Sequence, residues 1–133
     1  MIDIESEVFD HVAPILRDTF PGIYVTGEYN PTPPRFPAVS IMEADNRVLE
    51  PMRTTNIENA VSVMYECNVY SNKVNGKKSE AKEIASVLDG ALTEMGFTRT
   101  LMENVPNFNE ASIYRIISRY EAIVDKDLWI YHN

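Results

Sequence analysis

The centre of the chain carries a regular alternation of apolar and polar positions. Apolar side chains recur at every second residue from Val61 to Val69, which places them on one face of a β-strand. We predict this strand over residues 60–70, ended by the turn-forming segment 71–77. Its other face is a mixed surface that suits contact with water or a neighbouring subunit: Ser62, Met64, Glu66, Asn68 and Tyr70.

A long amphipathic helix is predicted directly after that turn. Ser79 is the expected N-cap, and Gly96 stands where a left-handed C-cap residue belongs. The apolar stripe of the helix is Ala81, Ile84, Ala85, Leu88, Ala91, Leu92 and Met95. A strand and a helix that each have one apolar face bury those faces against each other, so we expect this pair to organise the domain.

The rest of the chain predicts a second helix and further strands. The pattern over residues 3–20 indicates a helix that Pro14 should kink, or split near Ala13. Segment 29–37 holds four of the eight prolines and cannot be regular structure. Strands are predicted over 23–28, 38–43, 97–102 and 111–125. The fold class is therefore α+β, with two layers: a mixed, mostly antiparallel sheet of about four to five strands and two helices on one face.

Two segments extend this single domain, which we place at residues 1–125. Residues 44–59 are polar and too numerous for an ordinary connection, so we predict a protruding arm or long loop. Residues 126–133 form a C-terminal tail rich in aromatic side chains. In the last strand, Arg115 and Arg119 alternate with isoleucines, which favours a face covered by another chain or cross-strand pairing with residues such as Glu66.

Charge and cysteine content narrow the function classes. Twenty acidic against twelve basic residues give a net charge of -8, which disfavours a protein that binds the phosphate backbone. The same charge does not exclude a ring whose wall repels DNA passing through it. The single cysteine, Cys67, excludes an internal disulfide and indicates a reducing compartment. With no signal pattern and no apolar run approaching about 20 residues, a soluble, cytoplasmically made protein is expected.

No catalytic, cofactor or metal site is predicted. His11, His132 and Cys67 are too scattered to hold zinc, and Cys67 fits a buried structural thiol better than a nucleophile. The five glycines form no phosphate-binding or nucleophile motif. The lysine-rich turn 72–78 is explained as the entry to a helix, without a ligand. Four features suit interaction instead: the polar arm, the proline-stiffened loop, the mixed outer faces of two long strands and the aromatic tail. Together they favour an assembly subunit over an enzyme.

Five stretches share the pattern of a known family: 36–41, 64–73, 76–82, 95–100 and 113–115. They resemble tail terminator (tail completion) proteins of long-tailed phages, of the type common in phages and prophages of Firmicutes. The resemblance implies an α/β subunit that forms a hexameric ring on the end of the tail tube. Such a ring stops polymerisation of the tube and presents a face to the connector of the head.

The resemblance also implies partners and a location in the virion, at the tail and neck. The expected partners are other copies of the chain, the major tail tube protein and the head–tail connector proteins. DNA would only pass through the lumen, with no specific nucleic-acid binding and no membrane contact. Subunit contacts are placed on the arm, at Arg47 and Arg53, and on the outer face of the last strand, at Arg115 and Arg119.

Two alternatives stay open. The chain could be another neck component, such as a head-closure or minor capsid protein, which similar lengths and alternations also fit. From a different class, it could be a small ligand-binding or enzymatic α+β domain. That alternative predicts a concave apolar pocket with a few converging polar groups, and a monomer or dimer in solution.

Overall fold

A five-stranded sheet forms the body of the protein, with the strand order β1-β2-β5-β7-β6. β1 runs parallel to β2, and every other neighbouring pair is antiparallel. The strands are β1 (Tyr24–Thr26), β2 (Ala38–Val48), β5 (Ala60–Ser71), β6 (Thr98–Asn104) and β7 (Tyr114–Asp125). The computed structural model describes residues 1–49, 53–54, 57–106 and 111–131, with only the backbone for 53–54 and 57–58.

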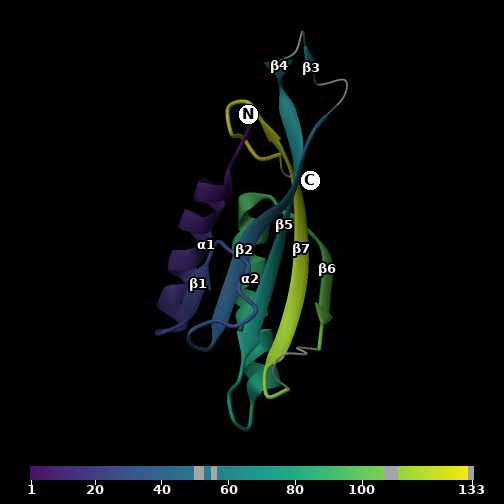
Figure 1. The fold of residues 1–133 in the computed structure, drawn as a ribbon. Coiled ribbons are helices and arrows are strands. Elements are labelled where there is room, and N and C mark those ends of the chain that lie inside the picture. The colour runs from purple at the N-terminus through teal and green to yellow at the C-terminus, as the bar shows by residue number, and fades with distance from the viewer. Residues whose placement is uncertain (50–52, 55–56, 107–110, 132–133) are drawn as a thin grey trace.

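Two helices cover one face of this sheet (Figure 1). The helix α1 (Glu5–Thr19) packs over β1 and β2, and α2 (Lys77–Met95) packs over β5 and β7. The helices also contact each other, so both lie on the same side. The predicted α+β fold with two layers is confirmed. Strand order, which the sequence left open, places the short β1 at one edge and β6 at the other.

The core lies between the helices and the alternate residues of the central strand. Val61, Val63, Tyr65, Cys67 and Val69 are all fully buried in β5. Burying an aliphatic or aromatic side chain of this size contributes about 1.5–3 kcal/mol relative to leaving it exposed. Burial also raises the pKa of the Cys67 thiol. The interpretation of Cys67 as a buried structural residue is confirmed.

The ends of α2 test the capping predictions. Gly96 adopts the left-handed conformation, with φ 109°, as predicted for the C-cap. The prediction that Ser79 is the N-cap is wrong, because α2 begins at Lys77 after Gly76. Gly76 has φ 143°, a conformation that favours glycine, and its carbonyl accepts the first helical bond from the Glu80 amide at 2.9 Å.

The first helix runs unbroken through its internal proline. Pro14 lies inside α1, so the predicted split near Ala13 does not occur. Val12, Ala13 and Leu16 are fully buried, so packing on the sheet holds both halves of the helix in line. Pro14 itself is exposed. Proline has no amide hydrogen to donate to the carbonyl group one turn earlier, and on this exposed side water can bond that carbonyl instead.

The arm is a continuation of two neighbouring strands, β2 and β5. β2 and β5 pair from Ala38 opposite Tyr70 to Val48 opposite Val61, with a bulge between Glu43 and Asp45. Beyond them, β3 (Arg53–Thr54) and β4 (Ile57–Glu58) form a small antiparallel sheet. Figure 1 shows this hairpin projecting beyond the body of the domain.

The C-terminal segment folds back onto β7. Ile130 forms an antiparallel bridge with Val124, and the Tyr131 amide donates to the Ile123 carbonyl at 3.0 Å. Trp129 is 64% exposed, so the attachment is through the backbone rather than through the indole ring. His132 lies outside the described residues. None of the described helices combines the length and apolar character that crossing a membrane requires.

Candidate assembly surfaces

The sheet face opposite the helices, here called the open face, is partly covered by the proline-rich segment 27–37. Figure 1 shows this segment crossing in front of the sheet after β1. Ser40, Asn68 and Tyr70 point to the open face by their register, yet each is at most 1% exposed. One end of the open face is therefore closed by the protein's own chain.

Arg115 connects that covering segment to the sheet. Its Nε and Nη2 atoms donate to Oδ1 of Asn68 at 3.1 and 2.9 Å. Its guanidinium lies 5.8 Å from the ring centre of Tyr29 in the covering segment and 5.7 Å from that of Tyr70. The Asn68 amide in turn donates to the Ser40 hydroxyl at 3.3 Å. Two of the three guanidinium nitrogens of Arg115 are thus bonded within the chain.

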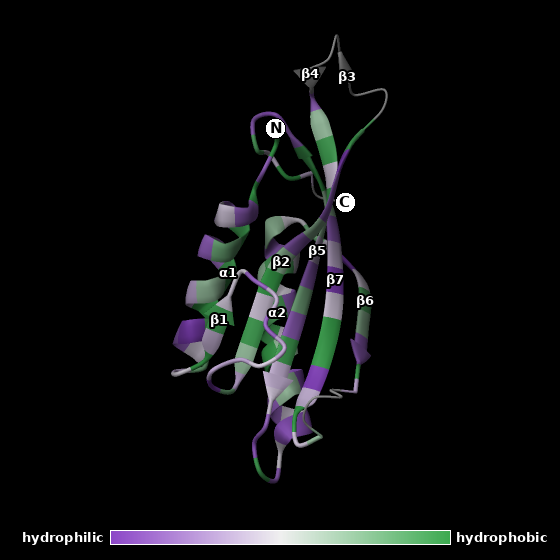
Figure 2. Cartoon of the chain, viewed as in Figure 1, coloured by the Kyte–Doolittle hydropathy of each residue, from purple (hydrophilic) through white to green (hydrophobic). Residues whose placement is uncertain are grey.

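Arg119 lies on the part of the open face that the segment leaves uncovered. Its Nη2 atom is 3.1 Å from Oε1 of Glu66, the cross-strand pairing that the sequence offered as one alternative. The Arg119 side chain is 44% exposed, which leaves it accessible. Figure 2 shows apolar and hydrophilic residues alternating along β7. The uncovered part also carries half-buried or exposed apolar residues: Met42, Met64, Leu101, Ile117 and Ile123.

The arm carries the other two predicted contact residues. Arg47 is 70% exposed and pairs with Asp45 on its own strand at 2.9 Å. Arg53 belongs to β3, for which the structure describes the backbone but not the side chains. The four arginines predicted as contacts therefore do not form one cluster, because two lie on the arm and two on the open face.

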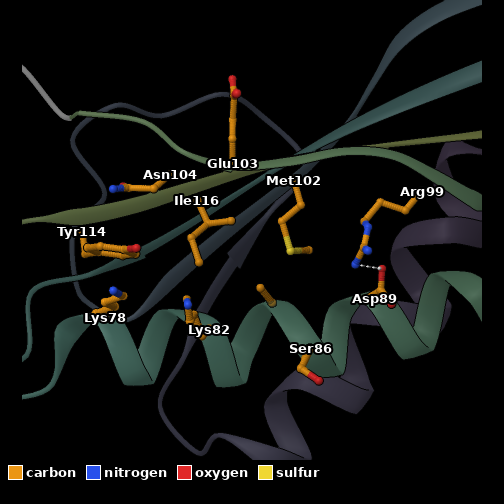
Figure 3. A pocket seen from close by; sticks show the side chains of 11 residues that line it. Lys78, Lys82, Ser86, Asp89, Arg99, Met102, Glu103, Asn104, Tyr114 and Ile116 are labelled. Atoms are coloured by element: carbon orange, nitrogen blue, oxygen red, sulfur yellow. Dashed lines mark hydrogen bonds and ion pairs between the residues drawn. The ribbon is translucent and has the colours of Figure 1, made fainter.

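One edge of the domain has a groove between α2 and β6, here called the basic groove (Figure 3). It measures about 490 Å³, and its lining includes Lys78, Lys82, Arg99, Met102, Tyr114 and Ile116. Arg99 pairs with Asp89 at 3.2 Å, and Asp89 also accepts the Tyr120 hydroxyl at 2.9 Å. Glu103 also belongs to the lining, and its side chain is directed away from α2 (Figure 3). Of the charged groups that line this groove, the ammonium groups of Lys78 and Lys82 and the carboxylate of Glu103 have no ion pair among the described residues.

The opposite edge has a second groove of about 500 Å³, here called the acidic groove. It lies between α1, the end of β1 and the part of β2 that β1 does not pair. Its charged lining residues are all carboxylates: Glu5, Asp10 and Glu28. Phe9 and Ile41 supply apolar lining. The two edges of one sheet thus carry grooves of similar size and opposite charge.

A cluster of carboxylates adjoins the acidic groove. Within the described part of the chain, Asp3, Glu5 and Glu43 have oxygens within 4.8 Å of one another. Burial raises the pKa of Glu43; the hydrogen bond from Asn46 opposes this rise, and the nearby carboxylates add to it. Asp3 also accepts the Glu5 amide at 3.0 Å, and Glu5 accepts the Glu43 amide at 3.1 Å. These two bonds, one to the first amide of α1 and one that attaches its first turn to β2, account for this cluster.

The buried ionisable groups of the core are not activated for catalysis. Burial raises the pKa of the Tyr65 and Tyr120 phenols, as it does for the Cys67 thiol. These groups therefore stay neutral at physiological pH, where a nucleophile or base would need a lowered or near-neutral pKa. What the described surface offers is charge complementarity between edges, a half-apolar sheet face and a projecting hairpin.

These features define a class: a small two-layer α+β domain with a hairpin arm, a half-apolar sheet face and a charged groove at each edge of the sheet. Among solved structures, the chain is similar to one chain of "Virion of native gene transfer agent (GTA) particle". The two share 15% sequence identity with a TM-score of 0.66, and the match covers 92% of this chain and 94% of that one. The likeness shows a shared fold. No protein-family model matches the chain, and no curated protein matches it.

The sequence reasoning missed both grooves. The available signal was the distribution of lysine, since four of the five lysines lie between Lys73 and Lys82. That cluster was interpreted as a helix entry because the sequence does not show that β6 and β7 approach the same flank of α2. A groove built from three separate elements becomes visible only in the folded chain.

Proposed function

We propose that this chain is a structural protein of a phage-like virion. The observation that carries the proposal is the fold shared with a chain of a gene transfer agent virion over 92% of the sequence. A projecting arm and complementary edges support the same role, because assembly subunits need surfaces that recognise other copies. In this role the chain works by contact rather than by catalysis.

Within that class, we propose a tail terminator that forms a hexameric ring. The ring caps the tail tube, stops its polymerisation and provides the interface for joining to the head. The net charge of -8 supports a lumen through which DNA slides without binding. Arg47 and Arg53 on the arm, and Arg119 on β7, are the proposed contacts with neighbouring chains, whereas Arg115 is already bonded to Asn68 within its own chain. The tube protein and the head connector are the proposed further partners.

Deletion of the gene from the phage or prophage that encodes the protein tests this role. Electron microscopy of the resulting particles should show tails of uncontrolled length that are not joined to heads. A copy of the gene supplied in trans should restore tails of uniform length. Tails of normal length beside heads that lose DNA would instead indicate a head-closure protein. Particles indistinguishable from the wild type would contradict a virion role.

A further inference from the structure

We propose that the basic groove of one copy receives the acidic edge of a second copy, so that the chains associate head to tail. This inference rests on the proposed assembly function and names the surfaces that carry it. The occupant is the outer side of α1 and the end of β1 in the second copy. Asp10 and Glu28 are its exposed carboxylates and Phe9 its partly buried apolar residue.

The lysines of the basic groove are not placed where they would stabilise their own helix. Lys77 and Lys78 open α2, and a positive charge at a helix N-terminus is unfavourable to the helix dipole. Lys78 and Lys82 are exposed and one turn apart, on the flank of α2 that faces β6 (Figure 3). The carboxylates Glu80 and Glu83 fall on the other flank by helical spacing. Asp89, the carboxylate of α2 that does line this groove, is paired with Arg99, so the two ammonium groups remain available to an acidic partner.

The floor of the basic groove is suited to a protein surface rather than to a small ion. Met102 and Tyr114 are half-buried, and Ile116 beneath them is 4% exposed. This apolar floor exists because α2 packs mainly over β5 and β7 and contacts β6 much less. A partner that brings an apolar side chain together with carboxylates would cover the floor and pair the lysines at once.

The acidic groove has the matching composition. Glu5, Asp10 and Glu28 line it without a lysine or arginine among its lining residues, and Phe9 lies beside them. Among the described residues, Asp10 and Glu28 have no side-chain ion pair. The guanidinium of Arg17 lies 5.8 Å from the ring centre of Phe9, a contact with the ring rather than with either carboxylate. The carboxylates of this edge therefore remain available to lysines of another copy.

The position of the two grooves favours a repeated contact. They lie at opposite edges of the sheet, one beside α1 at the β1 edge and one beside α2 at the β6 edge. Copies placed side by side with their helices on the same side bring the basic groove of one to the acidic groove of the next. A contact between two different surfaces of this kind generates rings or filaments. Pairing of like edges is opposed by charge repulsion.

A reciprocal charge swap in the full-length protein tests the contact. The first variant carries Lys78→Glu and Lys82→Glu, the second carries Asp10→Lys and Glu28→Lys, and the third carries all four changes. A matched control, Lys73→Glu with Lys126→Glu, has the same net charge as the first variant but alters exposed lysines outside the groove. Sedimentation velocity from about 10 μM to about 1 mM, at about 50 mM and about 500 mM salt, measures association.

The wild type and the control should associate at low salt, and high salt should weaken this association. The first and second variants should each lose about 10- to 100-fold in association constant. A mixture of the two, and the fourfold variant with the wild-type net charge of -8, should regain it. Circular dichroism checks that every variant is folded.

Two results would overturn the inference. One is a wild-type chain that stays monomeric at about 1 mM and low salt. The other is association that survives the first variant, or that the fourfold variant fails to restore, which would place the interface elsewhere. Neither result bears on the gene-deletion experiment. If deletion gives tails of uncontrolled length while the charge-swap variants associate normally, the virion role stands and only this interface is wrong. Particles indistinguishable from the wild type after gene deletion would instead contradict the virion role.

Discussion

The two faces of the central sheet use the same strands in opposite ways. On the helix-covered face, residues such as Tyr65 and Val69 are fully buried against α1 and α2. On the open face, the alternate residues Glu66 and Asn68 belong to polar pairs with Arg119 and Arg115. Because neighbouring residues of a strand point to opposite sides, one sequence of twelve residues in β5 serves both purposes.

The difference shows where stability and recognition are separated in this fold. The covered face is apolar and closed, so its changes act on the free energy of unfolding. The open face is divided again: the segment 27–37 and Arg115 close one end, while Arg119 and its apolar neighbours stay accessible. We therefore expect substitutions on the helix-covered face to lower stability. At the end of the open face that segment 27–37 covers, substitutions should affect both stability and association. At its uncovered end they should affect mainly association.

The largest expected effect comes from a substitution that creates a cavity beneath the helix-covered face. Leu88→Ala removes a fully buried side chain from the inner stripe of α2. The cavity and the lost burial should lower the free energy of unfolding by about 3 kcal/mol, measured by urea denaturation. Ser86→Ala, at an exposed position of the same helix, is the control and should change it by less than about 0.5 kcal/mol. Equal changes in the free energy of unfolding for the two variants would contradict the distinction between buried and exposed positions of α2.

The next effect concerns the closed end of the open face. Arg115→Ala should cost about 2 kcal/mol, because Asn68 is fully buried and would lose two donors. Limited proteolysis should also become faster within segment 27–37, since Tyr29 loses its contact with the guanidinium. Unchanged stability and unchanged cleavage would show that Arg115 is free to serve another chain instead.

Arg119→Glu sharpens the comparison at the uncovered end. An ion pair with a side chain 44% exposed contributes little, so stability should fall by at most about 1 kcal/mol. Like charge opposite Glu66 adds a small penalty. If this end meets another subunit, the variant should associate more weakly in light-scattering measurements while its circular dichroism is preserved. A large loss of stability with normal association would mean that Arg119 is structural.

The smallest expected effect is a pH dependence at the edge of the covered face. Folding raises the pKa of Glu43, so this carboxyl binds more protons in the folded state than in the unfolded state as pH rises through the ordinary range of a glutamate pKa. Stability contributed by the protonated carboxyl is present below that range and lost above it. Glu43→Gln should raise the melting temperature at pH 7 by roughly 1–3 °C and leave it unchanged near pH 3. A rise in melting temperature that persists at pH 3 would show that it has a cause other than the ionisation of Glu43.

The elements of the fold could be predicted from the sequence because each has a clear period. Alternation over 60–70 and helical spacing up to Gly96 suffice to define β5 and most of α2. Pro14 misled the prediction because a local rule says that proline interrupts a helix, whereas burial of its neighbours decides the outcome here. Tertiary packing, which the sequence does not display, outweighed the local preference.

The candidate surfaces were harder to predict. Arg115 and Arg119 occupy equivalent positions in the pattern, and only the fold of segment 27–37 makes one enclosed and the other accessible. The grooves combine residues from α2, β6 and β7, or from α1, β1 and β2, that are distant in the chain. Strand order decides which of these meet, and alternation alone does not specify strand order.

The central claim is that this chain assembles with itself into a closed ring. Light scattering coupled to size exclusion over a concentration series, with negative-stain images of the largest species, tests it most directly. The account predicts a ring of six copies with a central opening, each copy contributing 15.2 kDa. A compact dimer without an opening at every concentration would contradict it.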